Sequence, residues 1–142
     1  MSENAKIKHL QMLQDVIKRM GETCAATKRY ALVVFAAMAA LARVQEMPFV
    51  FLIAAVVVVV FWALDAQYLR QEKWFRDFYD VVRKKDKGDI DFDMTPPEDI
   101  RNKTGIGYGF GNWSTRWLYG ALFVITILLW LSSCNIATEG SA

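Results

Sequence analysis

An uncharged stretch of eighteen residues, 47–64, ends abruptly at Asp65 and constrains the fold of this chain more than any other feature. As a helix rising about 1.5 Å per residue it would reach roughly 27 Å, close to the hydrocarbon thickness of a bilayer. Most of its residues are Val, Ile, Leu or Phe, which favours insertion. Since no breaker follows Asp65, we predict a membrane span (residues 47–65) that continues directly into a cytosolic amphipathic helix (67–86).

Two weaker apolar segments flank this span. Residues 30–42 are uncharged but short, and they reach spanning length, 24–42, only if Lys28 and Arg29 snorkel toward the headgroups. A short link at 43–47 then makes the first two spans an antiparallel hairpin, residues 30–66. Ala36 and Ala40 form a small-xxx-small pair that would let another helix approach closely. Residues 113–134 form the third predicted span, with tryptophans at both ends as interfacial anchors.

These segments predict an all-α membrane protein with three transmembrane helices. Outside the spans we expect a cytosolic amphipathic helix (1–29), a cytosolic loop with a short helix (87–112) and a frayed tail (135–142). The letters Thr95-Pro-Pro-Glu98 have the form of a capping box, which predicts a short helix ending near Lys103. We interpret the glycine-rich residues 104–112 as a linker or tight turns, because neither a channel filter nor a phosphate loop fits their flanking sequence.

Two amphipathic faces in the cytosolic segments need a partner. The N-terminal helix carries a narrow apolar seam, and the extension of span two carries a broad aromatic face that would otherwise be exposed. We expect the two faces to pack on each other, within one subunit or between neighbours, rather than lie on lipid headgroups. His9 is expected to be a solvated side chain beside the seam. The predicted packing residues are Leu10, Leu13, Ile17 and Met20 on the seam, and Tyr68, Phe75, Phe78 and Tyr79 on the aromatic face.

Asp65 lies where the second span meets the membrane boundary. A carboxylate at this depth either pairs with a cation or serves as an ion or proton site. Both spans of a short hairpin meet the same interface, so Arg29 or Lys28 on the first span lies at the matching depth. We favour a structural membrane-boundary pair, Asp65 with Arg29, or with Lys28 in its place.

The distribution of cations predicts the orientation. Of 17 Lys and Arg residues, six precede Tyr30, ten lie between Asp65 and Trp117, and one, Arg43, lies in the link between spans one and two. The positive-inside rule therefore places the N-terminus and the middle segment in the cytoplasm and the C-terminus in the periplasm. No cleavable signal peptide is expected, since a charged amphipathic stretch precedes the first span.

No constellation of residues points to catalysis, a metal or a cofactor. Cys24 and Cys134 lie on opposite sides of the predicted membrane and lack metal-ligand spacing, and the aspartates of residues 86–93 lack the spacing of a calcium loop. We therefore expect no enzymatic activity, no nucleic-acid partner and no small-molecule substrate. The expected partners are the lipid bilayer and further copies of this chain.

Three stretches resemble one known family. They are IKHLQMLQDVIKRM at residues 7–20, FWALDAQYLRQEKWFRDFYDVVR at 61–83 and FDM at 92–94. Together with the hairpin between them they look like the RipA family of small octameric bacterial inner-membrane proteins, over residues 6–94. The resemblance implies a multi-pass helical protomer of the bacterial inner membrane that assembles as an octamer and has no assigned enzymatic activity.

Two function classes follow from these expectations. The first is a non-enzymatic homo-oligomer whose cytosolic helices form a collar and which serves as a scaffold or as a stress-linked envelope component. The second is a pore-forming channel or a membrane effector resembling the SLATT type. The absence of an internal row of ionisable residues in the predicted spans favours the first class.

Overall fold

The computed structural model describes residues 3–44, 47–86, 91–105 and 107–139, and within these ranges it is helical with no strands. Residues 45–46 of the predicted link, residues 87–90 of the predicted loop and residues 140–142 of the predicted tail lie outside the described part. The helices are α1 (Glu3–Val44), α2 (Phe49–Lys84), α3 (Glu98–Lys103), α4 (Gly107–Gly111) and α5 (Trp113–Glu139).

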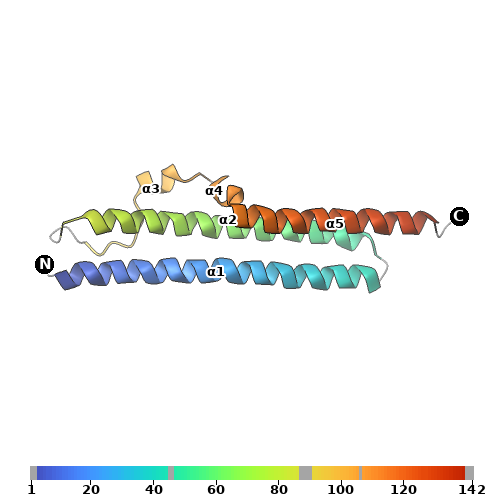
Figure 1. Ribbon diagram of the computed structural model, residues 1–142, viewed down its shortest axis with the longest axis horizontal. Helices are drawn as coiled ribbons and strands as arrows, with labels where there is room; N and C mark the ends of the chain where they lie inside the picture. Colours follow the sequence, from blue (N-terminus) through green and yellow to red (C-terminus); the bar gives the residue numbers. More distant parts are fainter. Residues whose placement is uncertain (1–2, 45–46, 87–90, 106, 140–142) are drawn as a thin grey trace.

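Two long antiparallel helices form the frame of the molecule. Figure 1 shows α1 and α2 running side by side, with the N- and C-termini at opposite ends of the molecule. Helix α5 packs along one half of α2, while α3 and α4 lie beside the other half. Three helices, α1, α2 and α5, are long and apolar enough to cross a membrane, which confirms the all-α class and the number of candidate spans.

Several element boundaries differ from the expected ones. Helix α1 passes through residues 29–30 without a break, and α5 continues five residues beyond 134. Helix α3 ends at Lys103 as expected, but it begins after Pro97 with no side-chain cap, so the capping box is not formed. The Asp93 carboxylate instead accepts a hydrogen bond from the backbone N–H of Thr95, at 2.8 Å. The expected linker at residues 104–112 contains α4, a short helix in its own right.

Among the described residues, the core forms three separate clusters along the hairpin. The first lies at the end near the N-terminus and contains Leu13, Phe78, Val82 and Ile100. The second joins α1, α2 and α5 through Ala31, Val58, Tyr119 and Leu122, and the third lies near the turn with Ala42, Val50 and Phe51. We call the hairpin around the first cluster the stalk, because polar and charged side chains cover its surface, whereas apolar side chains cover the remainder.

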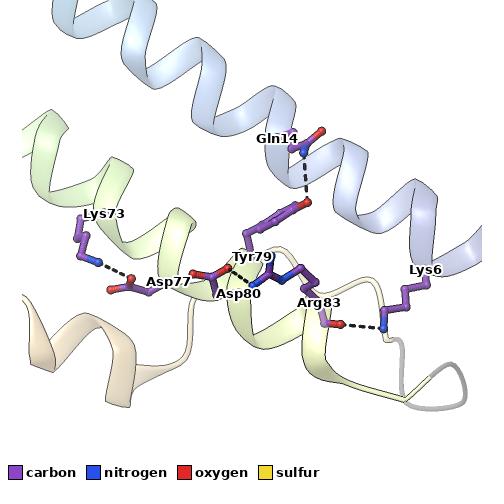
Figure 2. A network of polar contacts seen from close by, with 7 residues as sticks. All are labelled: Lys6, Gln14, Lys73, Asp77, Tyr79, Asp80 and Arg83. Atoms are coloured by element: carbon purple, nitrogen blue, oxygen red, sulfur yellow. Dashed lines mark hydrogen bonds and ion pairs between the residues drawn. The ribbon is translucent and has the colours of Figure 1, made fainter.

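Polar contacts tie the end of the stalk together (Figure 2). The Lys6 ammonium donates hydrogen bonds to the carbonyl oxygens of Arg83 at 2.9 Å and Lys85 at 2.7 Å, where α2 ends. A cation at this position favourably meets the unpaired carbonyls and the negative end of the helix dipole. Farther along, the Gln14 amide donates to the Tyr79 hydroxyl at 3.2 Å, so α1 also holds α2 from the side.

Candidate functional site

The most unusual site in the molecule is a buried charge pair at the level where α5 begins to pack on α2. Asp65 is fully buried, and its Oδ2 accepts the Lys28 ammonium from α1 at 2.7 Å. The buried Thr115 hydroxyl of α5 lies 3.5 Å from the same oxygen. Three helices thus contribute polar side chains to one layer, which we call the charge layer and define as Lys28, Asp65 and Thr115.

The cation in this layer is Lys28, and the expected partner Arg29 is exposed on another side of α1. Buried Cys24, Thr27 and Ala31 mark the side of α1 that faces α2, and Lys28 follows the same three- and four-residue spacing. Arg29 lies about 100° farther around the helix. The two cations differ by only about 1.5 Å along the helix axis, so the direction of the side chain decides which of them reaches Asp65.

Other buried polar groups surround the charge layer. Neither Asp65 Oδ1 nor the Tyr119 hydroxyl has a hydrogen-bond partner in the described part of the chain. Tyr119 is fully buried and stacks on Trp62 of α2, with ring centroids 6.4 Å apart. The Thr27 hydroxyl donates to the backbone carbonyl of Thr23, four residues earlier in the same helix. The layer is therefore polar, with two buried oxygens that could accept or donate further hydrogen bonds.

The glycine-rich segment covers this layer. Gly109 of α4 is buried so closely against α2 that an added methyl group would overlap the carbonyl group of Ala66, the residue after Asp65. Phe110 then packs edge-on against Trp62, at 5.7 Å between ring centroids. Only glycine permits this approach, so Gly109 allows the short helix α4 to pack beside the charge pair, in a segment expected to form a linker or tight turns.

Burial makes a cationic partner obligatory for Asp65. A single carboxylate removed from water is strongly destabilised, whereas a paired and hydrogen-bonded one is tolerated. The geometry fits a fixed structural contact that sets how α1, α2 and α5 lie against one another. In the described part of the chain no group of three or more His, Cys, Asp or Glu side chains could hold a metal ion.

The predicted packing residues fall into two sets. On the stalk, Leu13 and Phe78 are buried in the first cluster, and Leu10, Phe75 and Tyr79 pack around them, so seam and aromatic face meet within one chain. Ile17, Met20 and Tyr68 are half-buried. Ala36 and Ala40 are exposed, because the side of α1 that faces α2 is lined instead by residues such as Ala39 and Ala42. The small-xxx-small pair therefore points away from its own hairpin.

His9 differs from its expected solvated position, because it is fully buried in the stalk. Its Nε2 lies 3.0 Å from the carbonyl oxygen of Asp93, and its ring packs near those of Phe78 and Phe92. Phe92 has a φ of 56°, a left-handed conformation that costs free energy in a residue other than glycine. The segment that follows α2 thus folds back over His9, which the periodicity of α1 alone could not indicate.

Comparison with known proteins found no match: neither a family model, nor a curated protein, nor a solved structure matches this chain.

The charge pair can be tested by removing one or both charges. We expect Lys28→Met to lower the free energy of unfolding by about 3–5 kcal/mol, because it leaves Asp65 buried without a cation. Lys28→Met combined with Asp65→Leu should recover most of this loss, while Arg29→Met should change it by less than about 0.5 kcal/mol. Thermal unfolding in detergent, followed by circular dichroism, measures the differences. Equal effects of Lys28→Met and Arg29→Met would contradict the structural role.

The close packing of α4 on α2 can be tested by substituting two glycines of α4. Gly109→Ala should destabilise the protein by about 1–3 kcal/mol, because the methyl group displaces α4 from α2. Gly111→Ala meets open space and should be neutral or stabilising by up to about 1 kcal/mol. Trypsin cleavage after Lys103 should accelerate only in Gly109→Ala. If both variants unfold at the same temperature, close packing at Gly109 is not required.

Proposed function

We propose that this chain is a non-enzymatic, homo-oligomeric protein of the bacterial inner membrane whose stalk helices form a cytosolic collar, serving as a scaffold or envelope component. The supporting observation is the division of one continuous hairpin into an apolar half and a polar stalk, separated by the charge layer. Such a hairpin anchors in the bilayer and projects a rigid, helical surface from it. The stretches at residues 7–20 and 61–83, which resemble the RipA family, support an octamer.

Small residues on an outer face of the spans are the physical argument for assembly, because lipid covers ordinary apolar surface but close helix packing needs small side chains. Ala36 and Ala40 lie on the outer side of α1, where a helix of a neighbouring subunit could approach closely. In the stalk, the apolar seam of α1 and the aromatic face of α2 already cover each other within one chain. These faces therefore need no neighbouring subunit, and the stalk is a weaker argument for assembly. We therefore place the proposed subunit contacts in the membrane half, and the proposed collar follows from the position of the stalk.

A pore is the second candidate. The unpartnered Asp65 Oδ1 and Tyr119 hydroxyl favour it, because they place two polar oxygens inside a buried layer between helices. Against it, Lys28 neutralises Asp65, and the spans offer no continuous row of ionisable groups. The scaffold remains the better supported proposal.

Assembly is tested by native mass spectrometry of the protein in detergent. We expect a single closed octamer, and Ala36→Leu should weaken it because the larger side chain keeps helices apart. Ala37→Leu, the same substitution at a neighbouring exposed alanine, is the matched control. A monomer in the unsubstituted protein would contradict the proposal. Ion flux into liposomes that disappears in Asp65→Asn, with subunit number unchanged, would favour the pore instead.

Orientation is tested with reporter fusions at two positions. A reporter fused after Asp86 should be active in the cytoplasm, and one fused after the last residue, Ala142, should be active in the periplasm. The physical reason is the retention of Lys- and Arg-rich segments on the cytoplasmic side. A cytoplasmic reporter at the C-terminus would show that α5 does not cross the membrane.

A further inference from the structure

The side of α5 that faces away from the hairpin carries a groove of about 530 Å³. Its lining residues follow helical spacing along one face: Arg116, Trp117, Gly120, Ala121, Val124 and Ile125. The residues of α5 that pack inward, including Thr115, Tyr119 and Leu122, lie on the opposite side of the helix. The groove is therefore open to whatever surrounds the apolar half of the molecule.

The groove is charged at one end and apolar at the other. Arg116 is exposed, and its guanidinium forms no ion pair with any described residue. It follows Thr115, which contacts Asp65, so this free cation lies at the depth of the charge layer. Trp117 comes next, and the small residues Gly120 and Ala121 leave a shallow, open hollow that continues to Val124 and Ile125. Arginine pairs well with phosphate, and tryptophan favours the membrane interface.

We propose that this groove binds one anionic phospholipid, with its phosphate on Arg116 and an acyl chain along Gly120 and Ala121. The charge complements an anionic headgroup, and the apolar end lies along the helix axis, as an acyl chain does in a bilayer. The proposal rests on the insertion of α5 in the membrane, which the proposed function includes, but not on the number of subunits.

A second copy of this chain fits the groove less well. An occupying helix would have to place a carboxylate opposite Arg116 at the depth of the charge layer. Among the described residues, the apolar segments 24–44, 49–65 and 116–135 contain one carboxylate, Asp65, and it is buried against Lys28. A lipid supplies the missing negative charge without exposing that pair.

The test uses the full-length protein in nanodiscs of equal amounts of phosphatidylglycerol and phosphatidylcholine. Native mass spectrometry after gentle release counts the lipids retained by each protomer. We expect one retained phosphatidylglycerol per protomer and about a fivefold preference over phosphatidylcholine, equivalent to about 1 kcal/mol for one cation at the membrane surface. Arg116→Gln should abolish the preference. Arg29→Gln is the matched control, because Arg29 is an exposed cation one residue from the same charge layer and should leave it unchanged.

A third variant tests the groove itself. Gly120→Leu places a large side chain in the hollow, where nothing lies within 4 Å of its Cβ position, and it should remove the retained lipid while Arg116 remains. Equal losses in Arg116→Gln and Arg29→Gln would show diffuse surface charge and overturn the proposal. Retention of the lipid in Gly120→Leu would also overturn the proposal. A lower subunit number in Gly120→Leu would overturn it too, because it would identify the groove as a contact between subunits. A monomeric or inverted protein would still expose the groove to lipid. Loss of lipid retention can therefore be distinguished from an error in the proposed subunit number or orientation.

Discussion

A carboxylate buried between helices needs a cation, and in this chain that requirement links the three long helices. The Lys28 ammonium lies 2.7 Å from the Asp65 carboxylate and the Thr115 hydroxyl lies beside the same oxygen, so each of the other two long helices gives this buried group a partner. A slip of α1 by one residue would turn Lys28 away and leave the charge unpaired, at a cost of several kcal/mol. The pair therefore fixes both the depth and the rotation of α1 against α2, and through Thr115 it also positions the start of α5.

The two halves of the hairpin, on either side of the charge layer, are stabilised by different interactions. Toward the turn, apolar side chains are exposed on α1, α2 and α5, where a bilayer would replace water, and two apolar clusters fill the interior. In the stalk, one cluster around Leu13 and Phe78 is covered by α3 and by residues 92–93, which lie over His9. Polar contacts such as that of Lys6 with the end of α2 add to this cover. The hydrogen bond to Asp77 raises the pKa of Lys73, which favours the charged form of the Lys73 ammonium.

The outward surfaces of the membrane half remain available for partners, and they are not alike. The outer side of α1 presents small alanines suited to close helix contact, whereas the outer side of α5 presents a cation, a tryptophan and a hollow suited to a lipid. A subunit contact through α1 and a lipid on α5 can therefore coexist in one assembly. The charge layer sets the depth of both surfaces, because Lys28 and Thr115 belong to it.

Much of the architecture could be predicted from the sequence because its causes are local. Helices must satisfy their own backbone hydrogen bonds in lipid, and spans of about twenty apolar residues follow from membrane thickness, so the all-α class and three candidate spans were predictable. The continuity of α2 past Asp65 followed from a periodic pattern without a breaker. A cation for Asp65 at the depth of residues 28–29 followed from the geometry of a short hairpin.

Only the tertiary structure decided which groups meet, because rotation around a helix axis and contacts between distant segments are not local properties. Lys28 rather than Arg29 reaches Asp65 since Cys24, Thr27 and Ala31 turn that side of α1 toward α2. Thr115 and Tyr119 carry no sequence signal that would place them beside residue 65. The sequence around Gly109 is typical of a linker or turns, and only the contact with Ala66 shows why a glycine is needed there. The position of His9 in the sequence predicts a solvated side chain, and only the backbone of Asp93, which lies against it, explains its burial. For Thr115, Gly109 and His9 the deciding neighbour lies more than 35 residues away in the chain, beyond the reach of periodicity, whereas the four-residue step from Cys24 to Lys28 was visible in the sequence.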